Sequence, residues 1–262
     1  AGDIMMLYQE DGSCLVERNS LRTDDSAPHK AVFSYSTENV VQKLFLPETV
    51  FLQPHHESVI VAKRVFTKAC AMLSYLSVCA VMKNEGPYLR EWLEFHRMVG
   101  VEHFYLYDNN SSDETPNIVA PYEDNGIVTL HHWPEHPLQM KAYMHCLTAY
   151  RQRSFWIAFI DLDEFIVPVA APDIPGILRE FESYGALAVN WLIYGNSGHA
   201  TRPHGLQIEQ YVYRSEAVWK SNRHVKSIVN PRRTKAPRDP HCFRYLDGFG
   251  AVDENHQPVE GP

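Results

Sequence analysis

A regular alternation of strand-like and helix-like segments between residues 76 and 160 is the feature that most constrains the fold of this chain. Residues 76–82 (LSVCAVM) form a continuous apolar run, as in strands buried on both faces of a sheet. Residues 88–96 then place apolar side chains at helical spacing. Further strands are expected at 103–107, 127–130 and 155–160, and further helices at about 115–122 and 138–151. This alternation predicts an α/β fold with a mainly parallel central sheet flanked by helices.

The segments on either side of this region have a different pattern. Residues 1–75 contain short apolar runs separated by polar stretches, which predicts a small β-rich N-terminal appendage. Beyond Gly185, a strand expected at 186–193 leads into a region rich in glycine, proline and arginine, which is typical of active-site loops. We therefore expect two parts, an appendage over residues 1–75 and an α/β domain over residues 76–262.

Charge and hydrophobicity exclude several classes of protein. The chain has 24 Lys and Arg against 32 Asp and Glu, a formal net charge of -8, so it lacks the basic footprint of a nucleic-acid-binding protein. The longest apolar run, residues 69–82, is interrupted by serine and is shorter than the roughly 20 residues of a membrane-spanning helix. The five cysteines form no CxxC pair, which argues against a zinc site. We expect no nucleic-acid partner and no transmembrane segment in this chain.

Acidic residues follow the strand expected at 155–160, in the sequence FIDLDEF (residues 159–165). Asp161 and Asp163 are two positions apart, so extended backbone would direct both carboxylates to the same side. Ligands of open α/β sheets bind beyond the carboxyl ends of the strands. Two close carboxylates repel each other, and manganese or magnesium would relieve that repulsion. The pair is a candidate metal site, although the same pattern also arises by chance or as a helix cap.

Polar residues also follow the first two strands of the α/β region. Residues 83–87 (KNEGP) precede a helix, and both Glu85 and Pro87 suit a helix N-terminus. Residues 108–115 (DNNSSDET) could hydrogen-bond a ribose or a base, or could form an ordinary turn and cap. Each segment alone fits a ligand site or simple capping.

Together these strand ends resemble those of glycosyltransferases of the GT-A fold, and in detail those of glycosyltransferase family 92 and the family-2-like proteins related to it. The resemblance covers about residues 76–245. It is carried by KNE (83–85), EWLEFH (91–96), DNNSSD (108–113), WIAFIDLDEFIVP (156–168), NW (190–191), GNSGH (195–199) and KSIVNP (226–231). It implies a hexosyltransferase that moves a sugar, with galactose as one candidate, from a UDP-sugar to a glycan or other hydroxyl acceptor. Because family 92 is an inverting family, the resemblance also implies inversion.

The resemblance assigns roles to individual residues. Asp161 and Asp163 match the DxD motif, which holds manganese or magnesium against the diphosphate, and His241 matches a late histidine that also binds the metal. The nucleotide-sugar pocket is expected to contain residues from all three strand ends and a late lysine: Lys83, Glu85, Asp108, Asp113, Asp161 and Lys226. The basic run 232–235 is an alternative to Lys226 for neutralising the diphosphate, although such loops are often only solvated.

The acceptor side is less defined by the sequence. Glu209 follows the segment that begins at Trp191, so it is a candidate for the base that removes the acceptor proton. A half-exposed strand carboxylate without catalytic function fits this position as well. Trp191 is expected to bind the acceptor by stacking on a sugar face, or else to belong to the core.

Two other functions remain open on the same residues. One is a catalytically silent carbohydrate-binding protein with this fold, and the other is a nucleotidyltransferase, for which KNEG (83–86) is a poor phosphate loop. Members of the family commonly continue into a further helix, so we expect the 76–262 domain to be truncated at its C-terminus. The expected compartment is the cytoplasm for a complete chain and the Golgi lumen for the catalytic fragment of an anchored protein.

Overall fold

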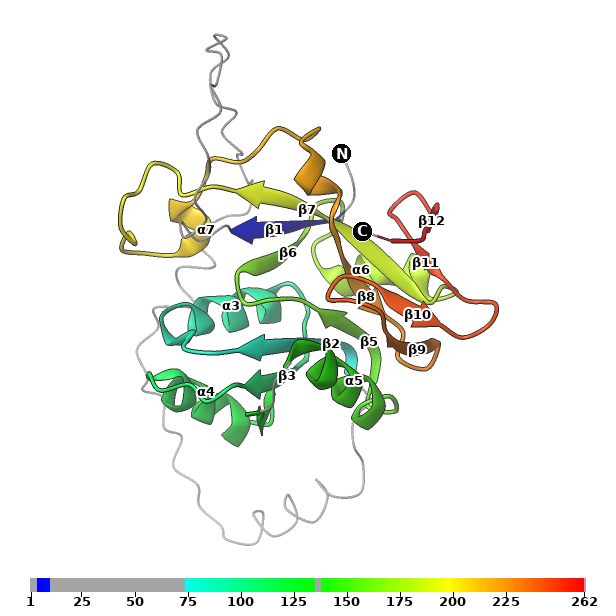
Figure 1. Ribbon diagram of the computed structural model, residues 1–262, viewed down its shortest axis with the longest axis horizontal. Coiled ribbons are helices and arrows are strands. Elements are labelled where there is room, and N and C mark those ends of the chain that lie inside the picture. The colour runs from blue at the N-terminus through cyan, green and yellow to red at the C-terminus, as the bar shows by residue number, and fades with distance from the viewer. Residues whose placement is uncertain (1–3, 10–73, 135–137, 262) are drawn as a thin grey trace, which may run out of the picture.

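The computed structural model describes residues 4–9, 74–134 and 138–261 (Figure 1). Residues 1–3 and 10–73 of the expected appendage lie outside this described part. No helix among the described residues is both long and apolar enough to span a bilayer.

The central part of the sheet has the order β5-β2-β3-β4, and its neighbouring strands are parallel. These strands are β2 (Ser74–Met82), β3 (His103–Asp108), β4 (Val128–His132) and β5 (Ser154–Phe159). The helices between them are α3 (Gly86–Met98), α4 (Thr115–Asp124) and α5 (Gln139–Ala149). The expected α/β alternation is therefore confirmed, with boundaries close to the expected ranges.

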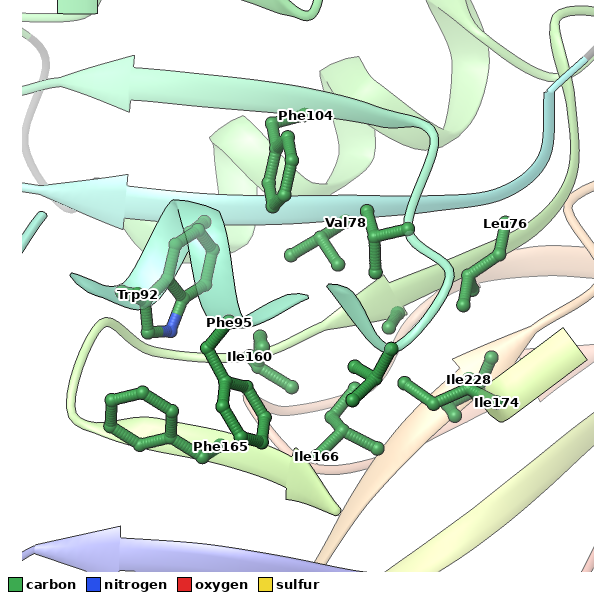
Figure 2. Packing of buried hydrophobic residues seen from close by; sticks show 14 of the residues in the cluster. Leu76, Val78, Trp92, Phe95, Phe104, Ile160, Phe165, Ile166, Ile174 and Ile228 are labelled. Carbon is green, nitrogen blue, oxygen red and sulfur yellow. The ribbon is translucent and has the colours of Figure 1, made fainter. Parts of the chain in front are cut away.

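Helices cover both faces of this sheet because its strands are apolar on both sides. On one face, Leu76 and Val78 of β2 belong to a cluster with Trp92 and Phe95 of α3. Figure 2 shows these rings beside Phe165, whose ring centroid lies 5.2 Å from that of Phe95. On the other face, a second cluster is formed by side chains of β2, β3, β5 and α5: Cys79, Tyr105, Tyr107, Tyr143, Cys146, Leu147, Ile157 and Phe159. A central sheet with both faces covered explains why the strands read as continuous apolar runs.

Beyond β5 the sheet becomes mixed. Strand β8 (Val225–Val229) lies between β5 and β7 (Ala186–Tyr194) and is antiparallel to both. Strand β1 (Ile4–Gln9) pairs with β6 (Glu164–Pro168) and with β7, so residues 4–9 of the expected appendage belong to the main sheet. Strands β11 (Ala251–Val252) and β12 (Pro258–Val259) extend the edge beyond β7. The sheet is thus parallel at its centre and mixed beyond it.

Short elements fill the region that was expected to consist of loops. They are α7 (Gln207–Gln210), η2 (Lys220–Arg223) and the hairpin of β9 (Thr234–Pro237) and β10 (Phe243–Tyr245). Before this region, α6 (Ile174–Leu178) and η1 (Arg179–Phe181) lie between β6 and β7. The alternative that Glu209 is a half-exposed strand carboxylate is wrong, because this residue lies in the short helix α7 and its side chain is exposed. Within the described part of the chain, no strand pairs with residues 207–210.

Candidate active site

The three polar strand ends lie at one edge of the sheet. Met82, the last residue of β2, is paired with Asp108, the last residue of β3. On the other side of β2, Phe159 of β5 is paired with Cys79, and the Ile160 amide donates to the Cys79 carbonyl over 3.3 Å. The segments that begin at residues 83, 109 and 160 therefore leave adjacent parallel strands at the same carboxyl-terminal edge.

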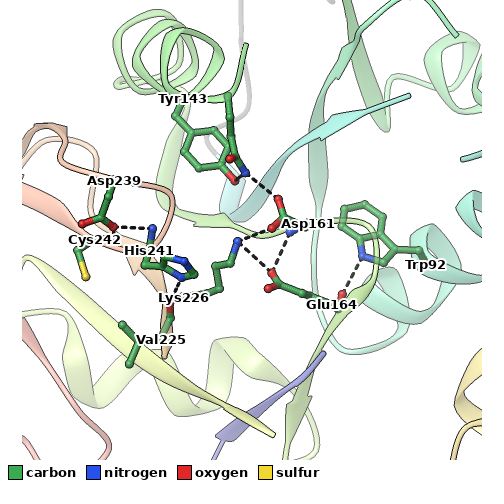
Figure 3. A network of polar contacts seen from close by, with 10 residues as sticks. Trp92, Tyr143, Asp161, Glu164, Val225, Lys226, Asp239, His241 and Cys242 are labelled. Atoms are coloured by element: carbon green, nitrogen blue, oxygen red, sulfur yellow. Dashed lines mark hydrogen bonds and ion pairs between the residues drawn. The ribbon is translucent and has the colours of Figure 1, made fainter. Parts of the chain in front are cut away.

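Asp161 is the centre of a polar network at this edge (Figure 3). Its Oδ2 lies 2.6 Å from Nζ of Lys226, and its Oδ1 accepts a hydrogen bond of 2.9 Å from Nε2 of Gln139. The same lysine lies 3.4 Å from Oε2 of Glu164, which also accepts from the Asp161 amide over 2.9 Å. Asp161 is therefore fixed from α5, from β8 and from within its own turn.

The antiparallel direction of β8 explains which basic residue reaches the site. Ala158 of β5 is paired with Ile228, so β8 starts at the carboxyl end of β5 and runs away from it. Lys226 therefore lies beside Asp161, whereas residues 232–235 lie at the opposite end of the sheet. The Arg232 Nε atom instead donates to Oε1 of Gln152, over 3.2 Å. The alternative that residues 232–235 neutralise a diphosphate at this site is therefore wrong.

The site carries more negative than positive charge. The Lys226 and Glu164 side chains are 1% and 0% exposed. Burial, together with the negative charge of Asp161, raises the pKa of Asp163 to about 7, although the charge of Lys226 opposes this shift. Burial also raises the pKa of Glu164 to about 8 against the same opposing charge. Burial alone would lower the pKa of Lys226, but its two carboxylate partners raise it overall. The site thus holds three carboxyl groups and one ammonium group, which pairs with two of them, and this excess of carboxyl groups favours an additional cation.

The donor atoms suit a metal that is shared with a substrate. Across residues 4–9, 74–134 and 138–261, no group of three or more His, Cys, Asp or Glu side chains is arranged to hold a metal ion. Nδ1 of His241 is 2.9 Å from the Val225 carbonyl oxygen, and burial lowers the pKa of this histidine. Magnesium is often bound by one or two carboxylates together with substrate phosphates. Asp161 and Asp163 fit that mode, and the combined site with His241 stays a prediction.

Asp108 and Asp113 organise the loops beyond β2 and β3. Asp113 accepts hydrogen bonds from the amides of Gly86 and Thr115, each over 3.0 Å, at the starts of α3 and α4. Asp108, which is 8% exposed, accepts from the Ser111 amide over 3.2 Å. A Cβ atom at Gly86 would lie 3.0 Å from the Asp113 carboxylate, so this close approach favours glycine. Asp113 thus joins the two loops, while Lys83 is exposed and Glu85 is half-buried at the start of α3.

Helix α3 clamps the segment that follows the aspartates, which sequence reasoning missed. The Trp92 indole nitrogen donates to the Glu164 carbonyl over 2.8 Å. The Ile166 amide donates to Nε2 of His96 over 3.2 Å, while Nδ1 of this histidine faces the Trp92 carbonyl oxygen at 2.8 Å. The i, i+4 spacing of Trp92 and His96 was the available signal, since such residues share a helix face. Glu164, the third acidic residue in the DLDE sequence, and Gln139 were also missed.

The expected acceptor residues lie on neighbouring elements. The Trp191 ring stacks on His224 with centroids 5.1 Å apart and meets His241 edge-on at the same distance. Helix α7, which carries Glu209, is held at its start by Glu91, whose carboxylate accepts from the Gln207 amide over 2.8 Å. The roles of Trp191 and Glu209 stay predictions.

Comparisons with known proteins show which family this chain resembles. The profile of glycosyltransferase family 92 matches residues 75–236. A glycosyltransferase family 92 protein of Ricinus communis is 29% identical over 185 residues, which are 68% of this chain and 33% of that protein. A family 92 protein of Oryza sativa subsp. japonica is 31% identical over 160 residues, 60% of this chain and 27% of that protein. Galactan beta-1,4-galactosyltransferase GALS2 of Arabidopsis thaliana is 28% identical over 177 residues, 61% of this chain and 34% of its own.

The chain spans about a third of the length of these curated relatives. Among solved structures, that of S. aureus TarS 1-349 is similar with a TM-score of 0.39 and 19% identity, over 49% of this chain and 38% of that one. This structural similarity is too partial to bear on function. The α/β sheet with flanking helices is the architecture expected of the GT-A fold. Because the family profile matches more than half of its residues, the chain belongs to glycosyltransferase family 92.

Proposed function

We propose that this chain carries the donor site of a metal-dependent hexosyltransferase, which moves a sugar from a UDP-sugar to a hydroxyl group of a glycan with inversion. The observation that carries the proposal is the carboxylate cluster of Asp161, Asp163 and Glu164 at the carboxyl end of β5, in a member of family 92. Galactose is the candidate sugar because two relatives, which are 28% and 27% identical, are named galactan beta-1,4-galactosyltransferases.

Asp161 and Asp163 are the proposed ligands of a manganese or magnesium ion. When bound, such an ion supplies positive charge opposite the diphosphate as it departs. The Asp161 carboxylate is already fixed before the donor binds, because it accepts hydrogen bonds from Lys226 and Gln139. The backbone amide of Asp161 also donates to Glu164. This preorganisation matters because groups that need no rearrangement stabilise developing charge most effectively.

The nucleotide is proposed to bind across the ends of β2 and β3. Glu85 and Asp108 would face it, and Lys83 is exposed beside them. Asp113 is proposed as a positioning residue, since its two oxygens accept amides from the two loops of this pocket. Lys226 would act in the same way through Asp161, because its ammonium group is buried in ion pairs.

The acceptor is proposed to approach from the side of β7 and α7. Trp191 would stack on a sugar ring, and Glu209 would take the proton of the attacking hydroxyl group. The acceptor oxygen then bonds to the anomeric carbon as the bond to the diphosphate breaks, so the configuration inverts in one displacement. Product analysis by NMR with UDP-galactose and a β-1,4-galactan oligosaccharide should show a β-linked product, whereas an α-linked product would rule out inversion.

A thermal-shift experiment tests the donor site first. The chain is heated with UDP, ADP, GDP or CMP, with and without manganese, beside the Asp161→Asn/Asp163→Asn double variant. A ligand that binds only the folded state raises the apparent melting temperature by mass action. We expect a manganese-dependent shift with UDP that the double variant loses. If no nucleotide shifts a sample that is folded by circular dichroism, the donor-site proposal is wrong.

A further inference from the structure

A group of basic side chains lies at the end of the sheet opposite the Asp161 site. Residues 151–153 precede β5, and residues 232–235 follow β8, which is antiparallel to β5. In Figure 1, β9 and β10 lie on the side of the view opposite α7. We define the basic face by its members Arg151, Arg153, Arg232, Lys235 and Arg244.

Two hydrogen bonds and one strand pairing place these residues near one another. The Arg151 Nη2 atom donates to the Thr234 carbonyl over 3.1 Å, next to Lys235. The Arg232 Nε atom donates over 3.2 Å to the side chain of Gln152, which stands between Arg151 and Arg153 in the sequence. Arg244 lies on β10, where it is paired with Ala236 of β9. Three members of the face are exposed and two are half-buried.

The positive charge of this face is not compensated locally. Within the described part of the chain, none of its five members forms an ion pair. Arg151 and Arg232 are oriented by neutral oxygens instead. Residues 150–153 and 230–247 contain seven basic and two acidic residues, although the whole chain has a net charge of -8. One of these acids, Asp239, is already paired with Arg238 over 3.1 Å. The charge of the molecule is thus segregated, with a positive end on an acidic protein.

Exposed apolar side chains adjoin the basic face. Leu246 and Phe249 are each 41% exposed. The Leu246 amide donates to the Arg233 carbonyl over 2.8 Å, and the Arg233 guanidinium lies 4.8 Å from the centre of the Phe249 ring. Both apolar residues are therefore attached to the basic segment that follows β8.

We propose that the basic face, together with Leu246 and Phe249, binds the surface of a membrane that contains anionic phospholipids. Such a surface attracts clustered lysine and arginine side chains, and its boundary with the acyl chains accepts apolar side chains beside them. A soluble polyanion would use the cations but would leave Leu246 without a partner. Binding in this orientation directs the carboxyl ends of β2, β3 and β5 away from the lipid. The proposal does not depend on the proposed transferase activity.

Vesicle sedimentation tests the charge contribution. The chain is mixed with phosphatidylcholine vesicles, or with vesicles that also contain roughly 30% phosphatidylserine, at about 0.1 M salt. The basic-face variant is Arg153→Glu/Lys235→Glu/Arg244→Glu, at three exposed positions. The matched control, Arg90→Glu/Lys220→Glu/Arg223→Glu, changes the net charge equally at exposed positions elsewhere. We expect a loss of binding to anionic vesicles of at least roughly tenfold in the basic-face variant and of less than about twofold in the control.

The proposal is wrong if the wild-type chain binds both kinds of vesicle equally, or if the control variant loses as much binding as the basic-face variant. A Leu246→Ser/Phe249→Ser variant separates a membrane from a soluble polyanion. We expect it to bind anionic vesicles more weakly but dextran sulfate as well as the wild type does. Unchanged vesicle binding would mean that the basic face recognises polyanions in general, which overturns the membrane proposal. The far-UV circular dichroism spectrum of each variant is compared with that of the wild type to check that the variant is folded.

Discussion

At the scale of single residues, Lys226 is the buried cation of the site. Its side chain is 1% exposed and contacts Asp161 and Glu164. Burying an ammonium group is costly, and the ion pairs offset that cost. Glu164 is itself fully buried, and its Oε1 has no hydrogen-bond partner within the described part of the chain. Removing the lysine would therefore leave the buried Glu164 carboxyl group without its ion-pair partner.

We predict that, above pH 8, where Glu164 is ionised in the wild type, Lys226→Met lowers the free energy of unfolding by about 3–5 kcal/mol, because breaking a buried ion pair strands its partner. Urea unfolding followed by circular dichroism measures the change. Adding Glu164→Leu should recover part of the loss, since the stranded carboxylate is then gone. Lys83→Met, at an exposed position, is the control and should change stability by less than about 0.5 kcal/mol. Equal effects at positions 83 and 226 would contradict the prediction.

His96 should make stability depend on pH. Burial lowers the pKa of this histidine to about 4, and its hydrogen bond to Trp92 opposes the shift only partly. In the unfolded chain, His96 therefore binds a proton below its usual pKa of about 6.5. In the folded chain, the His96 imidazole stays neutral until the pH falls to about 4. The stabilisation is complete above pH 6.5 and is lost as the pH falls towards 4.

We predict that the wild-type chain loses about 3 kcal/mol of stability from this residue between pH 7 and pH 4. His96→Gln should lack this component, so the difference between the two proteins must shrink as the pH falls. Glu164 acts in the opposite direction because burial raises its pKa, and the comparison of variants removes its contribution. Exposed His224→Gln is the control. A pH-independent difference between wild type and His96→Gln would refute the assignment.

At the scale of elements, α3 links both sides of the site. Its inner face clamps β6 through Trp92 and His96. Its Glu91 carboxylate, 8% exposed, accepts the amides of Gln207 and Ile208 over 2.8 and 3.1 Å and so anchors α7. Arg202, which precedes α7 in the chain, also donates to the carbonyl of Pro87 in α3 over 2.9 Å. One helix thus fixes the turn with the aspartates and the segment that carries Glu209.

We predict that Trp92→Phe destabilises the chain by about 1–3 kcal/mol, because the buried Glu164 carbonyl loses its donor while most of the ring volume remains. Trp219→Phe is the matched control at a side chain that is 45% exposed, and should have little effect. Urea midpoints of the two variants decide the question. Equal midpoints would show that the clamp contributes nothing to stability.

Glu91→Gln should loosen α7 locally. An amide side chain has a single acceptor oxygen, so one of the two backbone amides loses its partner. We predict faster hydrogen exchange in peptides covering residues 205–211, with unchanged exchange in β3 as the internal reference. Uniformly faster exchange in both regions would indicate global destabilisation instead of a local anchor.

At the scale of the whole molecule, the sheet and its two helical layers protect groups that lie between them. Cys79 of β2 and Cys146 of α5 are both 0% exposed and belong to the cluster between the sheet and α5. Reaching either thiol requires separating α5 from the centre of the sheet. Burial, with Cys146 nearby, also raises the pKa of Cys79, which disfavours the reactive thiolate.

We predict that iodoacetamide modifies Cys79 and Cys146 only at the urea concentrations that unfold the whole chain, because the central sheet belongs to the most stable part of a domain. Mass spectrometry of the labelled peptides measures the extent at each cysteine. Cys242, at 8% exposure near the edge of the fold, should be labelled at lower urea. Labelling of all three at the same low urea concentration would contradict this order.

The sequence by itself determined the local pattern of this protein. Residues 76–160 alternate apolar runs with helical spacing, and these periods come from neighbouring residues, so they can be read without knowing any partner. For the same reason the aspartates after β5 could be placed at a strand end and, by resemblance, in family 92. Both expectations held because each rests on a contiguous stretch of chain.

Only the tertiary structure decided which distant residues meet. Lys226 lies 65 residues from Asp161 in sequence, and it reaches that carboxylate because β8 inserts antiparallel beside β5. The same strand direction sends residues 232–235 to the far end of the sheet. Glu209 lies on the short helix α7 and not on a strand, and the start of this helix is held by the Glu91 carboxylate, more than a hundred residues earlier in the chain. Strand order and direction depend on long-range pairing and burial, which no local period encodes.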